Sequence, residues 1–316
     1  MTLLVLLLVG GGVGLLILPA AARPLGRRVA PREWARFCAL ALAGGAVAVE
    51  AAAVLAAAPT VLRAAGVPTL AGACERMLGG LTPGGPVGGW AAAAVAFALP
   101  VVAGLGAVRT WEAQRVAWIE PWLGEHRCHG PHRLVILPTD QLLALNVPAR
   151  RPQIVISEGL AATLAPAELG AVLDHEAAHL AHRHHRYLLL ASAVDHSLGW
   201  LPLVHRSTGA LRVSLERWAD EAAAARPGAR QSLRDALLRV AHLLATPPAA
   251  VAFGGADALI ERLDALEAES GRPSVWLHAL LYAPGSALGG TALVAIGSWA
   301  GTADALLRAA GHCPVV

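Results

Sequence analysis

Four long apolar stretches constrain the fold of this chain more than any other feature of its sequence. A helix needs about 20 consecutive, mostly apolar residues to cross the hydrocarbon core of a bilayer. The stretches that meet this requirement are residues 2–20, 37–58, 90–108 and 275–306. Only 15% of all residues are charged, whereas a soluble domain carries about 25%. We therefore expect a mainly α, polytopic membrane protein with about four transmembrane helices.

The distribution of arginine predicts the orientation of these helices. Five Arg lie between the first two stretches, whereas residues 59–89 contain only Arg63 and Arg76. Loops rich in Lys and Arg stay on the cytoplasmic side. We therefore expect a multi-pass protein of the cell membrane, with residues 59–89 and both termini outside and residues 109–275 in the cytoplasm. A cleaved signal peptide at residues 2–20 is the alternative, but no basic residue precedes that apolar run.

A further apolar segment, residues 187–204, holds Asp195 and His196 at its middle. Charged groups at bilayer depth are costly unless they face protein or a water-filled cavity. We expect a helix that lies against the membrane or dips into it, and not a fifth span. The net charge of +3 is too small to indicate direct binding of nucleic acid.

The segment "LDHEAAHLAHRHH", residues 173–185, carries the strongest chemical signal. Pro166 suits a first helical position, and no Gly or Pro interrupts residues 171–190, so we expect a helix there. His175 and His179 then lie one turn apart on the same face, where both can reach one zinc ion, and Glu176 lies beside them to hold a water as general base. This is the HExxH arrangement of metalloproteases.

Such a zinc site needs a third protein ligand. His182 is a poor one, because it lies about 10.5 Å along the helix axis from His175. Glu216, on a second predicted helix over residues 215–225, is the better candidate. Asp220, one turn further, can orient a ligand imidazole. Glu216 and Asp220 could instead form a solvated helix face, but next to HExxH we favour the zinc site, with one Zn²⁺ on His175, His179 and Glu216.

These motifs resemble those of the BlaR/MecR-type membrane zinc metallopeptidases. The resemblance rests on "PQIVISEGL" (152–160), "LAPAELGAVLDHEAAHLAHRHH" (164–185), "GWLPLV" (199–204) and "ERWADEAAA" (216–224). The related HtpX and CAAX-prenyl-protease group shares the ExxAD pattern seen here at Glu216 and Asp220. The resemblance implies three transmembrane helices in residues 1–110 and a cytoplasmic, zincin-like α+β metalloprotease domain in residues 111–274. A fourth span and a short external tail follow in residues 275–316.

The resemblance also implies roles for single residues. His175, His179 and Glu216 become zinc ligands, Glu176 becomes the general base and Asp220 a supporting carboxylate. "IVIS" (154–157) resembles the edge strand on which such proteases align an extended peptide, and residues 258–266 resemble the helix after the zinc site. Two departures are Ala219, where the family usually has Cys, and the lack of a large external sensor domain after the fourth span. We therefore do not expect sensing of β-lactams through such a domain.

The leading functional hypothesis is an integral-membrane zinc endopeptidase that cleaves a protein or peptide substrate. A cytoplasmic transcriptional repressor is one candidate substrate, which would place the enzyme in signalling. The alternatives are an HtpX-like quality-control protease and a non-catalytic signalling protein that retains the zinc site. A scaffold would not need Glu176, which speaks against the last. The oligomeric state is not predicted.

Several other polar residues have two interpretations each. His196 and His205 are candidate oxyanion donors or polar residues at a helix end. Residues 125–132, "EHRCHGPH", form either an irregular second metal site or a polar loop, and residues 183–186 are interpreted as a basic patch at the membrane surface. Cys74 and Cys313 both fall outside the membrane and are candidates for a disulfide, whereas Cys38 and Cys128 should stay reduced.

Overall fold

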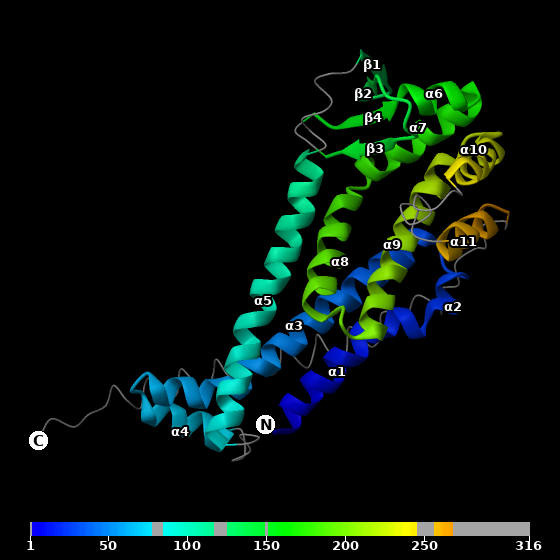
Figure 1. Ribbon diagram of the computed structural model, residues 1–316. Coiled ribbons are helices and arrows are strands. Elements are labelled where there is room, and N and C mark those ends of the chain that lie inside the picture. The colour runs from blue at the N-terminus through cyan, green and yellow to red at the C-terminus, as the bar shows by residue number, and fades with distance from the viewer. Residues whose placement is uncertain (1, 78–84, 117–124, 149–150, 245–255, 268–316) are drawn as a thin grey trace, which may run out of the picture. The chain divides into compact units, whose positions relative to one another are not determined.

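The computed structural model describes residues 2–77, 85–116, 125–148, 151–244 and 256–267. Most of these residues form helices, accompanied by one small sheet (Figure 1), so the prediction of a mainly α chain is confirmed. The helices are α1 (Thr2–Ala21), α2 (Arg23–Gly26), α3 (Pro31–Ala64), α4 (Pro68–Met77), α5 (Gly85–Val116), α6 (Glu158–Thr163), α7 (Pro166–Ala181), α8 (His184–Leu198), α9 (Pro202–Ala223), α10 (Ala229–Leu244) and α11 (Ala256–Glu267). The strands are β1 (Glu125–His129), β2 (His132–Leu137), β3 (Ala144–Val147) and β4 (Gln153–Ser157).

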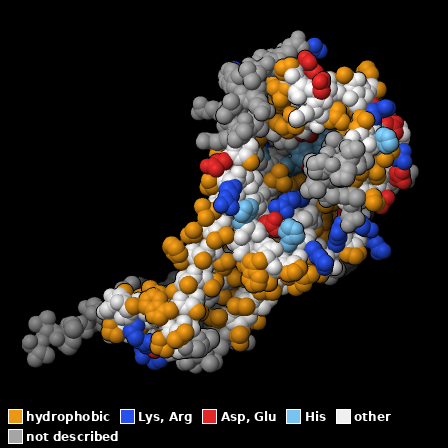
Figure 2. Space-filling view, in the orientation of Figure 1, with side chains coloured by type: hydrophobic (Ala, Val, Ile, Leu, Met, Phe, Trp, Pro, Cys, Tyr) orange, Lys and Arg blue, Asp and Glu red, His pale blue; other side chains and the backbone are white. Residues whose placement is uncertain are grey.

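Two helices, α3 and α5, are long and apolar enough to cross a membrane, and Val5–Ala21 of α1 is a shorter apolar helix. Apolar side chains cover these long helices (Figure 2), and α5 exposes residues as large as Phe97 and Leu105. An apolar surface of this kind suits contact with lipid. Some predictions fall wholly or partly outside the described residues. These are the fourth span, the limits of the domains and the position of Cys313.

Helices α1 and α3 approach each other closely. A Cβ added to Gly45 would lie 2.7 Å from the carbonyl oxygen of Gly12, so the missing side chain permits the contact. Just after α1, the guanidinium of Arg23 in α2 donates to the Glu261 carboxylate of α11 at 2.7 Å. Arg217 of α9 donates to the carbonyl of Gly26 at 3.1 Å. The segment after α1 is thereby joined to both α9 and α11.

The sheet has the order β1-β2-β4-β3, with β2 and β4 parallel and the other neighbours antiparallel. Its apolar side chains pack against α6, α7 and α10. Strand β4 lies inside the sheet, so the prediction of an edge strand at residues 154–157 is wrong. Ile154, Val155 and Ile156 are all buried because a central strand is covered on both faces. Strand β3 forms an edge of the sheet and packs against α7.

The predicted helix over residues 171–190 is interrupted. Helix α7 ends at Ala181 and α8 begins at His184, with Arg183 in the left-handed region at φ 54°. Residues 187–204 are also not one helix, because α8 ends at Leu198 and α9 begins at Pro202. They form the end of α8, a turn and the start of α9, with Trp200 exposed in the turn.

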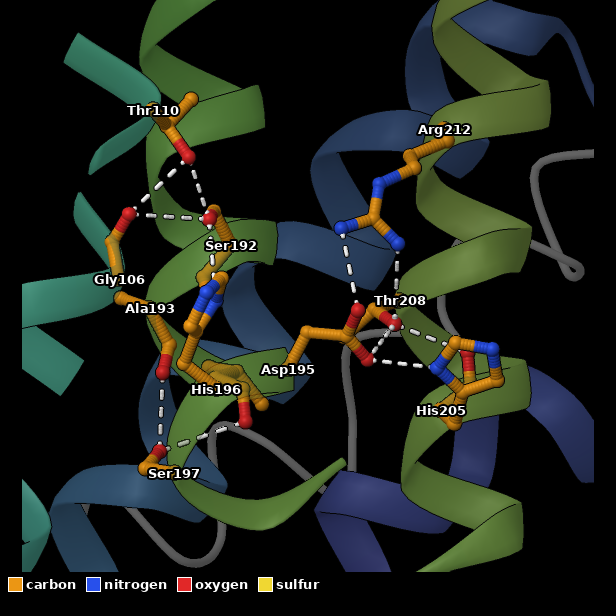
Figure 3. A network of polar contacts seen from close by, with 11 residues as sticks. Gly106, Thr110, Ser192, Ala193, Asp195, His196, Ser197, His205, Thr208 and Arg212 are labelled. Atoms are coloured by element: carbon orange, nitrogen blue, oxygen red, sulfur yellow. Dashed lines mark hydrogen bonds and ion pairs between the residues drawn. The ribbon is translucent and has the colours of Figure 1, made fainter. Parts of the chain in front are cut away.

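Polar contacts join α5, α8 and α9 (Figure 3). The hydroxyls of Thr110 and Ser192 lie 2.5 Å apart. Asp195 accepts hydrogen bonds from Thr208 at 3.0 Å and Arg212 at 3.3 Å, and lies 2.8 Å from Nδ1 of His205. His196 packs on Gly106. Asp195, His196 and His205 thus contact other protein groups in this apolar region. These contacts favour a role in helix packing for His196 and His205 over a role as oxyanion donors.

Candidate metal centre

Helices α7 and α9 face each other and carry the predicted site residues. One face of α7 packs its leucines, Leu173 and Leu180, against the sheet. His175 and His179 lie on its other side and are 7% and 6% exposed. Glu216 and Asp220 come from successive turns of α9. Asp220 is buried at 3% exposure, but the Glu216 side chain is 39% exposed. The centre is therefore largely dry but open to solvent at Glu216, and histidine side chains are visible in a recess of the surface (Figure 2).

Three side chains converge on one point. The Nε2 atoms of His175 and His179 lie 3.1 Å apart, and they are 3.4 and 3.5 Å from the Glu216 carboxylate oxygens. Donors bound tetrahedrally to zinc at ~2.0–2.1 Å are about 3.3–3.4 Å from one another. The chemistry and the spacing of this donor set therefore fit one such ion. Among the described residues it is the one group of three His, Cys, Asp or Glu side chains so arranged.

Asp220 and Arg262 contact two of the three metal-donor side chains through hydrogen bonds and ion pairs. Nδ1 of His175 lies 2.9 Å from Oδ1 of Asp220. Arg262 of α11 donates two hydrogen bonds of 2.7 Å to Asp220, and its Nη1 lies 3.2 Å from the Glu216 carboxylate. Burial would raise the pKa of Asp220, but Arg262 and His175 hold it below its ordinary value. Burial lowers the pKa of His175, but Asp220 and Glu216 outweigh it and raise the pKa to about 10.

His179 has a different partner. Its Nδ1 lies 2.9 Å from Nδ1 of His184. His184 is 1% exposed and packs beside Trp218, so its assignment to a basic surface patch is wrong. Burial, with the neighbouring His179 as a lesser cause, lowers the pKa of His184 to about 3 and keeps its imidazole neutral. His182 stacks on the Trp218 ring with centroids 4.6 Å apart and does not join the three-donor group.

Glu176 is held by the sheet. Nδ2 of Asn146, on the edge strand β3, donates to Oε2 of Glu176 at 2.7 Å. From the sequence, neither Asn146 nor Arg262 was singled out, and His184 was assigned to a surface patch. In the sequence, Asn146 is distinguished only as the one polar side chain in the apolar run Ala144–Val147. Arg262 lies in residues 258–266, which resemble the helix after the zinc site in the BlaR/MecR-type family.

The stretch 125–132 forms strand β1, the following turn and the first residue of β2, and His129 and His132 are paired in register. Nε2 of His129 lies 2.9 Å from Oδ1 of Asp174. Among the side chains of this segment that the structure describes, no three are arranged to hold a metal ion. The side chain of His126 is not among those described. The polar-loop interpretation is wrong, because residues 125–129 form strand β1 and His132 begins β2.

The family model described as BlaR1 peptidase M56 matches residues 145–266. This segment is similar to the M56 peptidase family. No curated protein and no solved structure matches the chain significantly. The M56 segment begins on β3 and ends on α11, so it includes Asn146, the HExxH residues, Glu216, Asp220 and Arg262. Together with two apolar helices of membrane-spanning length, it indicates a peptidase-type protein associated with membranes.

Proposed function

We propose that the chain is an integral-membrane zinc endopeptidase. The observation that carries the proposal is the convergence of His175, His179 and Glu216, at distances that suit one zinc ion, with Glu176 one residue after the first ligand. The M56 assignment of the surrounding segment supports it. The reaction we propose is hydrolysis of a peptide bond by water.

Zinc bound by His175, His179 and Glu216 would lower the pKa of a bound water and polarise the scissile carbonyl. Glu176 acts as the general base, which accepts the proton of the attacking water and passes it to the leaving amine. The amide of Asn146 fixes one carboxylate oxygen of Glu176 and leaves the other for the water. Asp220, itself held by Arg262, orients the His175 imidazole.

The substrate we propose is an extended stretch of protein chain. Strand β3 pairs with β4 on one side, and the order of the described sheet leaves its other side without a strand. An extended peptide can add to such an edge through main-chain hydrogen bonds. Because Asn146 of β3 contacts Glu176, a peptide on this edge would lie near the base. A cytoplasmic transcriptional repressor remains the first candidate to test.

The decisive experiment compares wild-type protein with Glu176→Gln. Full-length protein is purified in detergent, its zinc content is measured, and cleavage of unfolded protein substrates is followed. Glu176→Gln should keep one zinc per chain and lose about 10²–10⁴-fold in rate, since it removes the base but no ligand. Glu158→Gln, an exposed carboxylate on α6, is the matched control and should retain activity. Zinc-free wild-type protein, or full cleavage by Glu176→Gln, would refute the proposal.

A further inference from the structure

We propose that His184 is a positioning residue for the metal centre, because it fixes the tautomer of His179. The inference rests on the proposed function, in which His179 is a metal ligand. It concerns a residue that touches neither the ion nor the substrate. Its basis is the contact of 2.9 Å between Nδ1 of His184 and Nδ1 of His179 inside the protein.

Two neutral imidazoles that face each other through nitrogen must share one proton, so one ring donates and the other accepts. If His184 donated, His179 would carry its own proton on Nε2 and could not bind a metal there. If His179 donates from Nδ1, its Nε2 lone pair is free and faces Nε2 of His175 and the Glu216 carboxylate. The metal-binding form therefore requires His184 to accept through Nδ1 and to carry its proton on Nε2.

The second nitrogen of His184 gives independent support. Nε2 is buried and has no hydrogen-bond partner among the described residues. A buried polar atom without a partner opposes folding, and an apolar ring such as Phe would fill the same space without this cost. Packing alone therefore does not account for a histidine at this position. Acceptance of the His179 proton through Nδ1 does account for it.

The surroundings hold His184 in place. The left-handed conformation of Arg183 ends α7 and starts α8 at His184, which brings this side chain back towards His179. The Trp218 ring lies 4.8 Å from the His184 ring, centroid to centroid, and the His182 ring lies 5.8 Å away. The two ligand imidazoles are thus supported differently. His175 faces the carboxylate of Asp220, whereas His179 faces a neutral imidazole that adds no charge to the site.

The test measures zinc affinity of the full-length protein by competition with a chromophoric chelator. His184→Phe keeps a ring but offers no acceptor, and it should weaken zinc binding by about 10–100-fold. His184→Asn, whose Oδ1 can accept from His179, should restore most of the affinity. His182→Phe is the matched control: it changes a neighbouring ring on Trp218 and should leave affinity unchanged. His184→Leu replaces the Phe variant if that protein does not fold.

Thermal unfolding of the metal-free proteins separates positioning from packing. His184→Phe removes one unpaired buried donor but leaves Nδ1 of His179 without its partner, so its metal-free unfolding temperature should stay close to that of wild-type protein. Wild-type zinc affinity in both His184→Phe and His184→Leu would overturn the inference and leave the proposed function intact. So would equal losses of affinity and of metal-free stability in the Phe and Asn variants, which would indicate packing. A wild-type protein that binds no zinc would instead overturn the proposed function.

Discussion

The side chains around the candidate metal centre carry more carboxylates than guanidinium groups. Glu216 and Asp220 place two carboxylates against the single guanidinium of Arg262. The remaining negative charge favours a proton on His175, whose pKa is raised to about 10. At neutral pH the metal-free centre therefore holds an imidazolium where the metal would bind. A metal ion and this proton compete for Nε2 of His175.

Zinc affinity should consequently rise with pH. Because the raised pKa of His175 keeps the metal-free imidazole protonated up to about pH 10, zinc must expel one proton at any lower pH. Affinity should increase about tenfold per pH unit between about pH 6 and pH 9. Chelator competition at several pH values measures the slope. Calorimetry in two buffers of different ionisation enthalpy counts the protons released. A flat pH profile would contradict this expectation.

Replacement of Asn146 should affect catalysis and spare the metal. Asn146→Ala removes the 2.7 Å hydrogen bond to Glu176 but touches none of the three donors. A hydrogen bond to a charged group contributes about 1.5–3 kcal/mol, so kcat should fall about tenfold or more. Zinc content should remain one per chain. Steady-state kinetics separate kcat from KM, and an unchanged kcat would show that Asn146 does not position the base.

Whether a site residue could be predicted depended on its distance along the chain from its partners. His175 and His179, and also Glu216 and Asp220, are one helical turn apart, so spacing alone placed each pair on one face. Arg262 is 42 residues from the Asp220 that it holds, and Asn146 is 30 residues from Glu176. Only the tertiary fold reveals such contacts. His184 is close to His179 in sequence, but its contact depends on the helix break at Arg183, which neither Gly nor Pro marks.

At the scale of elements, the position of α7 depends on Glu168. Its carboxylate accepts from the backbone N–H of Ala165 at 2.9 Å and so satisfies a free donor at the helix start. Two further bonds of 3.0 Å come from Arg239 of α10. The helix that carries HExxH is thus fixed to a neighbouring helix at its first turn.

Loss of Glu168 should destabilise the protein in a pH-dependent way. The Arg239 and Ala165 hydrogen bonds lower the pKa of Glu168 from its ordinary value of 4.5. Its stabilising effect is therefore complete above about pH 5 and disappears as pH falls through the lowered pKa. Glu168→Ala should cost about 1 kcal/mol at pH 7, a typical cost of losing a helix cap. Thermal unfolding at pH 7 and pH 4 measures it against Glu158→Ala, and equal costs at both pH values would contradict this role.

Element prediction succeeded where local pattern decides the outcome. The first three apolar stretches and residues 175–179 of HExxH are helical, because length and periodicity are properties of the segment itself. The position of β4 within the sheet was predicted wrongly, because it depends on which strands pair with β4 on each side. The consecutive apolar residues Ile154, Val155 and Ile156 did indicate burial on both faces.

For the whole molecule, topology is the expectation with the widest consequences. Arginine asymmetry predicts that the M56 segment lies in the cytoplasm. A reporter fused after Arg151 should therefore behave as cytoplasmic, and one inserted within residues 78–86 as external. A fusion after Arg28, between the first two apolar helices, is the cytoplasmic control. Reversed signals from these fusions would contradict both the orientation and the choice of a cytoplasmic substrate.

Two neighbouring residues of α11 connect the membrane region to the metal centre. Glu261 is bound to Arg23, which follows the first apolar helix, and Arg262 is bound to Asp220, which contacts the ligand His175. A displacement of the first helix would act on α11 through the pair of Arg23 and Glu261, and α11 also carries the guanidinium that holds Asp220. Two adjacent side chains of α11 thus form a short mechanical linkage between the end of the first apolar helix and the candidate metal centre.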